Sequence, residues 1–160
     1  MKLSYLIKGF PGHPLHPPLT DVTIGTYSFA TVAAFLNVVG LVDRTASAAW
    51  WLALVVGLCS TALTATTGFV EWIEIEWGSP TWKTATWHLT VMLASSGVFL
   101  AAALVGHHDY VKGTVGAGSF VLTVIGFALL TLGGWLGGSI VFVHGMRVAA
   151  EERGATDARQ

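Results

Sequence analysis

The chain has 160 residues, of which 53% are hydrophobic and 11% are charged, and its mean hydropathy is +0.66. A soluble domain carries about 25% charged residues, so this composition excludes an ordinary soluble domain and predicts an integral membrane protein in contact with lipid. The net charge of −1 offers no basic surface, and we expect no nucleic-acid partner. The single cysteine, Cys59, excludes an intrachain disulfide.

The first 18 residues are rich in proline and histidine. Proline fixes φ and lacks a backbone N–H, so Pro11, Pro14 and Pro17 oppose a regular helix over this stretch. We expect residues 1–18 to cap one membrane face, with Pro18 in the first turn of a helix. No cleavable signal peptide is expected.

Apolar runs long enough to span a bilayer follow, since about 20 residues are needed for one crossing. The predicted spans cover about residues 22–42, 48–70, 86–105 and 115–143, and residues 144–160 form a polar tail. The expected fold is all-α, a four-helix transmembrane bundle that makes a single domain of residues 1–160. Trp50 and Trp51 are expected to anchor the second span at the membrane surface. No internal repeat is evident.

With four spans, both termini lie on one side of the membrane. The basic residues on that side are Lys2, Lys8, Lys83, Arg147, Arg153 and Arg159, whereas the opposite loops hold Arg44 and Lys112. By the positive-inside rule, we expect both termini to be cytoplasmic.

The same topology gathers histidines at one membrane face. His13 and His16 precede the first span, His88 opens the third and His144 follows the fourth. Ionisable groups inside a membrane are costly and usually face the bundle interior, so these imidazoles predict a shared ligand site. By contrast, residues 107–108 are two histidines that we expect in a solvated loop at the other face.

The fourth span carries a row of glycines that ends at His144. At about 100° per residue, Gly133 and Gly137 fall within roughly 20° of the azimuth of His144. Such a face admits closely packed atoms, either those of another helix or those of a flat cofactor.

Imidazole is a ligand for iron, copper and zinc, and histidine is a common axial ligand of haem iron. We expect one haem b, with His88 and His144 as the axial pair, His16 as the reserve ligand and His13 as the weakest candidate. Gly133 and Gly137 would then leave room for the macrocycle.

Basic side chains at the same face are expected to pair with the haem propionates, and these are Lys83 and Arg147. A haem with two histidine ligands has no open coordination position, which favours electron transfer to a separate protein partner.

Two other functions fit the same residues. A single transition-metal ion could be bound by a set of histidines and one carboxylate, namely His13, His16, His88, His144 and Glu71. Alternatively, the chain could be a structural subunit of a larger membrane complex, in which the glycines only pack helices.

Several motifs resemble a known family, domain of unknown function 2231, whose members are bacterial four-helix membrane proteins. They are GHPLHP at 12–17, GFVE at 68–71, KTATWH at 83–88 and WLGGSIVFVHG at 135–145. The resemblance implies a location in the bacterial inner membrane. Members are sometimes fused to, or encoded near, redox modules such as Rieske domains, and their helices are arranged like those of membrane b-type cytochromes. The resemblance therefore implies haem, electron transfer and a redox partner.

Overall fold

The computed structural model describes residues 9–10 and 13–146. These residues form two short strands and four long helices, each helix long and apolar enough to cross a membrane, which confirms the all-α bundle. In chain order the elements are β1 (Gly9–Phe10), β2 (His13–Pro14), α2 (His16–Val38), α3 (Arg44–Trp72), α4 (Pro80–Lys112) and α5 (Ala117–Phe142).

Proline does not delay the first helix as the sequence suggested. Helix α2 begins at His16, two residues before the start expected at Pro18, so Pro17 as well as Pro18 stands in its first turn. The N–H groups of a first turn have no acceptor within the helix, so proline loses nothing there. The predicted cap is therefore shorter, and its described part is the antiparallel pairing of β1 with β2.

Helix α4 is also longer than the predicted span. It begins after Ser79, whose hydroxyl accepts the Trp82 N–H at 3.1 Å, and it ends at Lys112, just before Gly113, whose φ is 89°. Its 33 residues extend for about 50 Å, whereas the hydrocarbon core is about 30 Å thick. Hydropathy marks only the part inside lipid, so the histidines at 107–108, predicted in a loop, lie on the exposed end of this helix.

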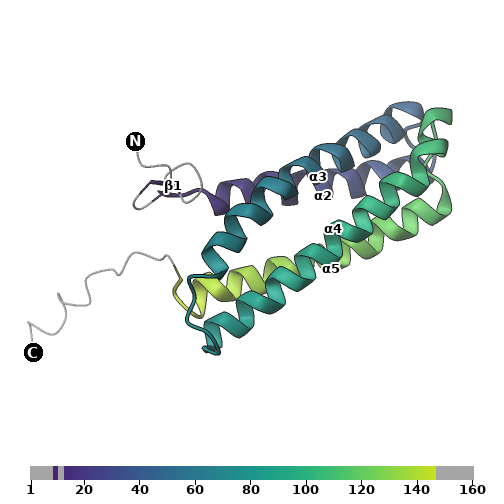
Figure 1. The fold of residues 1–160 in the computed structure, drawn as a ribbon. Helices are drawn as coiled ribbons and strands as arrows, with labels where there is room; N and C mark the ends of the chain where they lie inside the picture. Colours follow the sequence, from purple (N-terminus) through teal and green to yellow (C-terminus); the bar gives the residue numbers. More distant parts are fainter. Residues whose placement is uncertain (1–8, 11–12, 147–160) are drawn as a thin grey trace, which may run out of the picture.

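The helices pair as two hairpins. Helix α2 packs mainly against α3, and α4 packs mainly against α5. Figure 1 shows the hairpins side by side, with both tight turns at one end of the bundle and the start of α2 and the end of α5 at the other. We call these the turn end and the terminal end.

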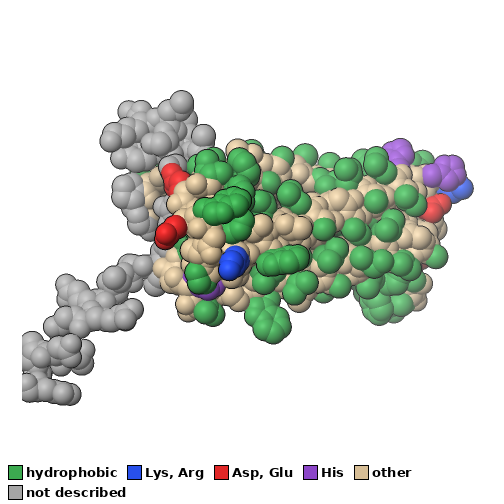
Figure 2. Space-filling view, turned by 60° about the horizontal axis from the view of Figure 1, so that its bottom comes forward, with side chains coloured by type: hydrophobic (Ala, Val, Ile, Leu, Met, Phe, Trp, Pro, Cys, Tyr) green, Lys and Arg blue, Asp and Glu red, His purple; other side chains and the backbone are tan. Residues whose placement is uncertain are grey.

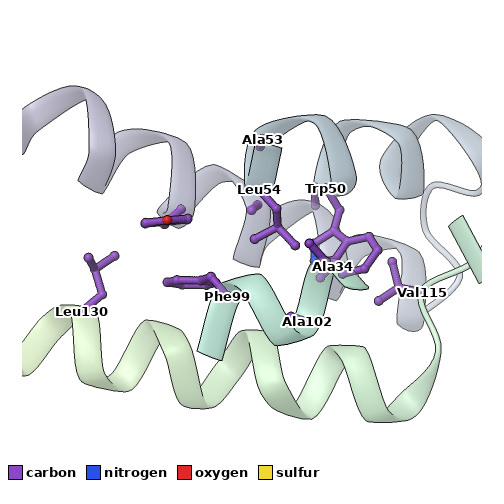
Figure 3. Packing of buried hydrophobic residues seen from close by; sticks show 12 residues of the cluster. Ala34, Trp50, Ala53, Leu54, Phe99, Ala102, Val115 and Leu130 are labelled. Atoms are coloured by element: carbon purple, nitrogen blue, oxygen red, sulfur yellow. The ribbon is translucent and has the colours of Figure 1, made fainter. Parts of the chain in front are cut away.

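Large side chains fill the middle of the bundle and the turn end. Tyr27, Trp50, Leu54 and Phe99 are fully buried, and Figure 3 shows Phe99 on α4 directed toward the α2–α3 hairpin. The Tyr27 and Phe99 rings stack with centroids 4.0 Å apart. The prediction that Trp50 anchors at the membrane surface is wrong, because its Nε1–H donates to Thr123 Oγ1 at 3.1 Å inside the core.

Asn37 joins the two tight turns. Its Nδ2 donates to the carbonyl of Asp43 at 2.8 Å, and its Oδ1 accepts the backbone N–H of Val115 at 2.7 Å. One side chain thus satisfies backbone groups in the turns of both hairpins.

The outer surface of the bundle is apolar. Leucine, valine and phenylalanine side chains are exposed along α2 to α5, and Figure 2 shows them covering the length of one face while charged side chains gather toward its two ends. A bilayer provides the apolar surroundings that this surface requires. The protein is an integral membrane protein.

Candidate functional site

A cavity of about 320 Å³ lies between the two hairpins at the terminal end. This volume is within the range of ligand pockets, about 300–1,000 Å³. Side chains from α2 to α5 line the cavity, most of them apolar; those that bear on the chemistry are His16, Asp21, Thr64, Gly68, Glu71, His88, Met92, Gly134, Gly137 and Gly138.

His16 enters the cavity from the first residue of α2. Its Nδ1 lies 3.1 Å from the carbonyl oxygen of Thr64 and 3.1 Å from Thr67 Oγ1, both on α3. The ring packs against Gly68, where an added Cβ would lie 2.6 Å from its Cε1. Glycine at this position is therefore what lets the imidazole approach α3 so closely.

His88 enters from the opposite hairpin, on α4. Its Nδ1 lies 2.8 Å from the carbonyl oxygen of Gly133 on α5, and its ring packs against Gly137. An added Cβ at Gly137 would lie 3.1 Å from Cε1 of the ring. The helix α5 glycines thus hold a histidine side chain of α4.

These hydrogen bonds determine which ring nitrogen carries the proton. A carbonyl oxygen can only accept, so Nδ1 is the donor in both His16 and His88. In the neutral ring Nε2 then carries the lone pair, and neither Nε2 has a hydrogen-bond partner among the described residues. Histidines that bind metals use this arrangement, in which the second nitrogen is held by a carbonyl or carboxylate.

Glu71 lies in the same cavity. It is a buried residue of α3, whereas Asp21, which also lines the cavity, is exposed. The described residues nevertheless contain no group of three or more His, Cys, Asp or Glu side chains arranged to hold a metal ion. The five-residue set suggested for a bare metal ion is therefore not assembled in this part of the chain.

The other two histidines of this face lie elsewhere. His144 follows α5, and its Nε2 is 3.0 Å from Thr84 Oγ1. His13 is an exposed residue of β2. Neither is among the residues that line the cavity, so the structure brings His88 together with His16 rather than with His144.

The basic candidates are only partly described. Lys83 is exposed in the first turn of α4, at the terminal end. Arg147 lies outside the described residues.

The glycines of α5 divide between two roles. Gly133 and Gly137 receive the side chains of Met92 and His88, so they do not form the open face that the sequence suggested. Gly134 and Gly138 line the cavity, as does Gly137 beside the His88 ring. A Cβ at Gly134 would meet no heavy atom within 4 Å among the described residues, apart from its own helical surroundings.

Sequence reasoning missed Gly68, Gly134 and the Thr64 carbonyl. The glycines at 133, 134, 137 and 138 form two overlapping pairs that differ by one residue, or about 100° around the helix. Only the packing of α5 against α4 decides which of these glycines meet side chains of α4 and which leave the cavity wall open. His16 could be predicted from the sequence, because it precedes the first span at the same membrane face at which His88 opens the third.

A family described as "Predicted membrane protein (DUF2231)" matches residues 12–150 of the chain. The protein belongs to the DUF2231 family. This confirms the resemblance drawn from the histidine and glycine motifs. No curated protein and no solved structure matches the chain.

In this DUF2231 protein, the family match covers the whole of the cavity. Both histidines that face it and both hairpins that hold them fall between residues 12 and 150. The cavity is therefore built from the part of the chain that defines the family.

Proposed function

We propose that this DUF2231 protein holds one haem b between His16 and His88 and transfers electrons to and from a separate redox protein. The main support is that two imidazoles from opposite hairpins line one cavity, each fixed at Nδ1 by a backbone carbonyl and each with a lone pair at Nε2. When bound, haem iron would supply one-electron redox chemistry.

The number of ligands favours haem over a bare metal ion. A zinc site takes three or four protein ligands, whereas haem iron needs protein ligands only at its axial positions. His16 and His88 supply two imidazoles, and the described residues assemble no larger donor group. These two imidazoles are the number that haem iron would take from the protein, and they are fewer than a zinc site takes.

The walls of the cavity also suit a flat apolar group. Gly134 leaves the backbone of α5 uncovered, and Gly138 has only the edge of Phe142, 3.9 Å from an added Cβ, beside it. Met92 contributes a flexible thioether, the kind of side chain that adapts to irregular surfaces. Lys83 is the described basic residue at this end of the molecule that we assign to a propionate.

We place the protein in the bacterial inner membrane with both termini in the cytoplasm. The cavity then lies near the cytoplasmic surface, and the electron donor and acceptor approach the terminal end from that side. The chain itself would act as an electron carrier.

Absorption spectra of the protein purified in detergent, oxidised and reduced with dithionite, test this function together with iron analysis on the same sample. We expect a sharp α band on reduction and about one iron per chain, as a single haem requires. The variants His16→Ala and His88→Ala should lose most of the iron, whereas His144→Ala should keep it. A colourless wild-type protein would refute haem binding, and loss of iron in His144→Ala alone would replace His16 by His144.

Gly134→Ala gives an independent test of where the ligand lies. The new methyl group meets no described atom, so the variant should fold like the wild type, yet it should weaken haem binding because it occupies the cavity wall. Gly97→Ala is the matched control, since Gly97 is equally open but does not line the cavity. Full haem content in Gly134→Ala would exclude a ligand seated on α5.

A further inference from the structure

Each hairpin holds its histidine in the same way. His16, on the first helix of one hairpin, bonds to the carbonyl of Thr64 and packs against Gly68. His88, on the first helix of the other, bonds to the carbonyl of Gly133 and packs against Gly137. In both hairpins the carbonyl comes four residues before the glycine, which is one helical turn.

Equivalent residues of the two hairpins are separated by constant offsets in the sequence. His16 and His88 are 72 residues apart, and Gly68 and Gly137 are 69 residues apart. The same two offsets relate a second contact deeper in the bundle, where Tyr27 packs against Gly57 and Phe99 packs against Gly126.

Burial follows the same offsets. The first helices bury Thr23, Ala30 and Ala34 where their counterparts bury Ser95, Ala102 and Gly106. The second helices bury Trp50, Leu54, Gly57 and Thr64 where their counterparts bury Ser119, Thr123, Gly126 and Gly133. The difference of three residues between the two offsets falls around the tight turns.

Equivalent residues meet between the hairpins. Tyr27 and Phe99 correspond to each other, and their rings stack with an interplanar angle of 8°. Arg44 and Gly113 also correspond, and an added Cβ at Gly113 would lie 3.2 Å from Cγ of Arg44. Equivalent residues touch only near a twofold axis. Because α2 and α4 run in the same direction, this axis lies along the helices, as in parallel repeats of membrane proteins.

We propose that α2–α3 and α4–α5 are two copies of one histidine-holding unit, related by a pseudo-twofold axis through the cavity. Gly68 and Gly137 are the equivalent positioning residues of the two units, and they present His16 and His88 to opposite faces of one planar ligand. The identity of that ligand rests on the proposed function, whereas the equivalence of the two units does not.

The repeat was missed in the sequence because few residues are identical at the two offsets. Ten pairs retain identity over residues 16–39 and 44–72, and those that are histidine or glycine are His16 with His88, Gly25 with Gly97, Gly57 with Gly126, and Gly68 with Gly137. All of the contacts that define the unit involve a backbone carbonyl or a glycine, so most side chains were free to change.

Substitution of the two positioning glycines tests the proposal on the full-length protein. A methyl group at Gly68 or at Gly137 displaces the ring packed against it, so Gly68→Ala and Gly137→Ala should each lower haemin affinity by about 10-fold or more, as loss of outer-shell support does. Gly25→Ala and Gly97→Ala are the matched controls, because these glycines are also equivalent and a Cβ there meets no heavy atom of the described residues within 4 Å. An effect from one positioning glycine alone would overturn the equivalence.

Nitrogen-15 NMR of the histidine rings tests the same proposal without haemin. In the ligand-free protein we expect His16 and His88 both as Nδ1–H tautomers, with Gly68→Ala shifting the His16 signals and Gly137→Ala those of His88. Different tautomers in the two rings would overturn the proposal. If the wild type binds no haemin but the rings respond in this paired way, the haem function fails and the duplicated unit stands.

A more conservative variant tests the proposal if the alanine variants do not fold. Thr67 gives His16 a second acceptor, and its counterpart is Leu136, so His88 has no such hydroxyl. Thr67→Val removes this difference without adding bulk, and the Nδ1 signals of His16 and His88 should move closer together. Signals that move apart, or do not move, would contradict the equivalence.

Discussion

At the scale of single residues, Asn37 is a polar side chain that hydrogen-bonds to both tight turns. It donates to the backbone of one turn and accepts from the backbone of the other, so it connects the two hairpins at the turn end. Backbone groups at these turns would need other partners if the amide were removed, because unsatisfied polar groups near lipid are costly.

Asn37→Ala should therefore destabilise the bundle by about 1–3 kcal/mol, given about 0.6–2 kcal/mol for each hydrogen bond in a membrane protein. Reversible unfolding in mixed detergent micelles measures this free energy. Asn37→Asp keeps the acceptor for Val115 and loses the donor to Asp43, so its loss should be smaller. An Asn37→Ala variant as stable as the wild type would show that the turns do not depend on this side chain.

At the scale of helices, packing depends on glycines placed where another helix brings a large ring. Gly106 of α4 is buried against the Trp50 ring and against Ser119, whose Cβ would lie 2.9 Å from an added Cβ. Gly97 lies two and a half turns earlier on the same helix, and a Cβ there would meet no heavy atom within 4 Å among the described residues.

Gly106→Ala should accordingly cost about 1–3 kcal/mol, the usual range for overpacking a well-filled core. Gly97→Ala should be neutral or slightly stabilising, because alanine is the better helix former. Thermal unfolding of both variants in one detergent compares them directly. Equal stability of the two variants would mean that α3 and α4 separate easily at this level.

The number and order of the helices could be predicted from the sequence, because apolar runs of spanning length are direct evidence of crossings. Helix ends were less predictable. Ser79 and the prolines of α2 set starts outside the apolar runs, where hydropathy carries no signal.

The candidate site was predictable only in part. Topology alone placed His16, His88 and Glu71 at one face of the membrane. The choice of His16 over His144 depends on how far each helix is rotated about its axis, and that rotation is set by contacts such as His16 with Gly68. A single sequence does not contain these angles.

At the scale of the whole molecule, the two ends of the bundle differ in how they are packed. The turn end is closed by Trp50, Val115 and Asn37, whereas the terminal end contains the cavity. The side of the membrane on which the terminal end lies therefore decides which compartment would supply the proposed redox partner.

Single cysteines on a Cys59→Ser background test this orientation. With cytoplasmic termini, Asp43→Cys in a tight turn should react with a membrane-impermeant maleimide in intact spheroplasts. Glu76→Cys, in the loop between α3 and α4, should react only after permeabilisation. Mass-tag gel shifts measure the labelling. The reverse pattern would place the cavity on the outer side of the membrane.

The closed turn end has an electrical consequence. Moving one elementary charge across the whole membrane changes its energy by about 2.3 kcal/mol for each 100 mV of potential. The cavity reaches in from the terminal end, and stacked rings of Tyr27 and Phe99 lie beyond it. An electron that reaches the proposed haem from the terminal end therefore crosses only part of the voltage, and we expect the midpoint potential of that haem to change by less than the full membrane potential.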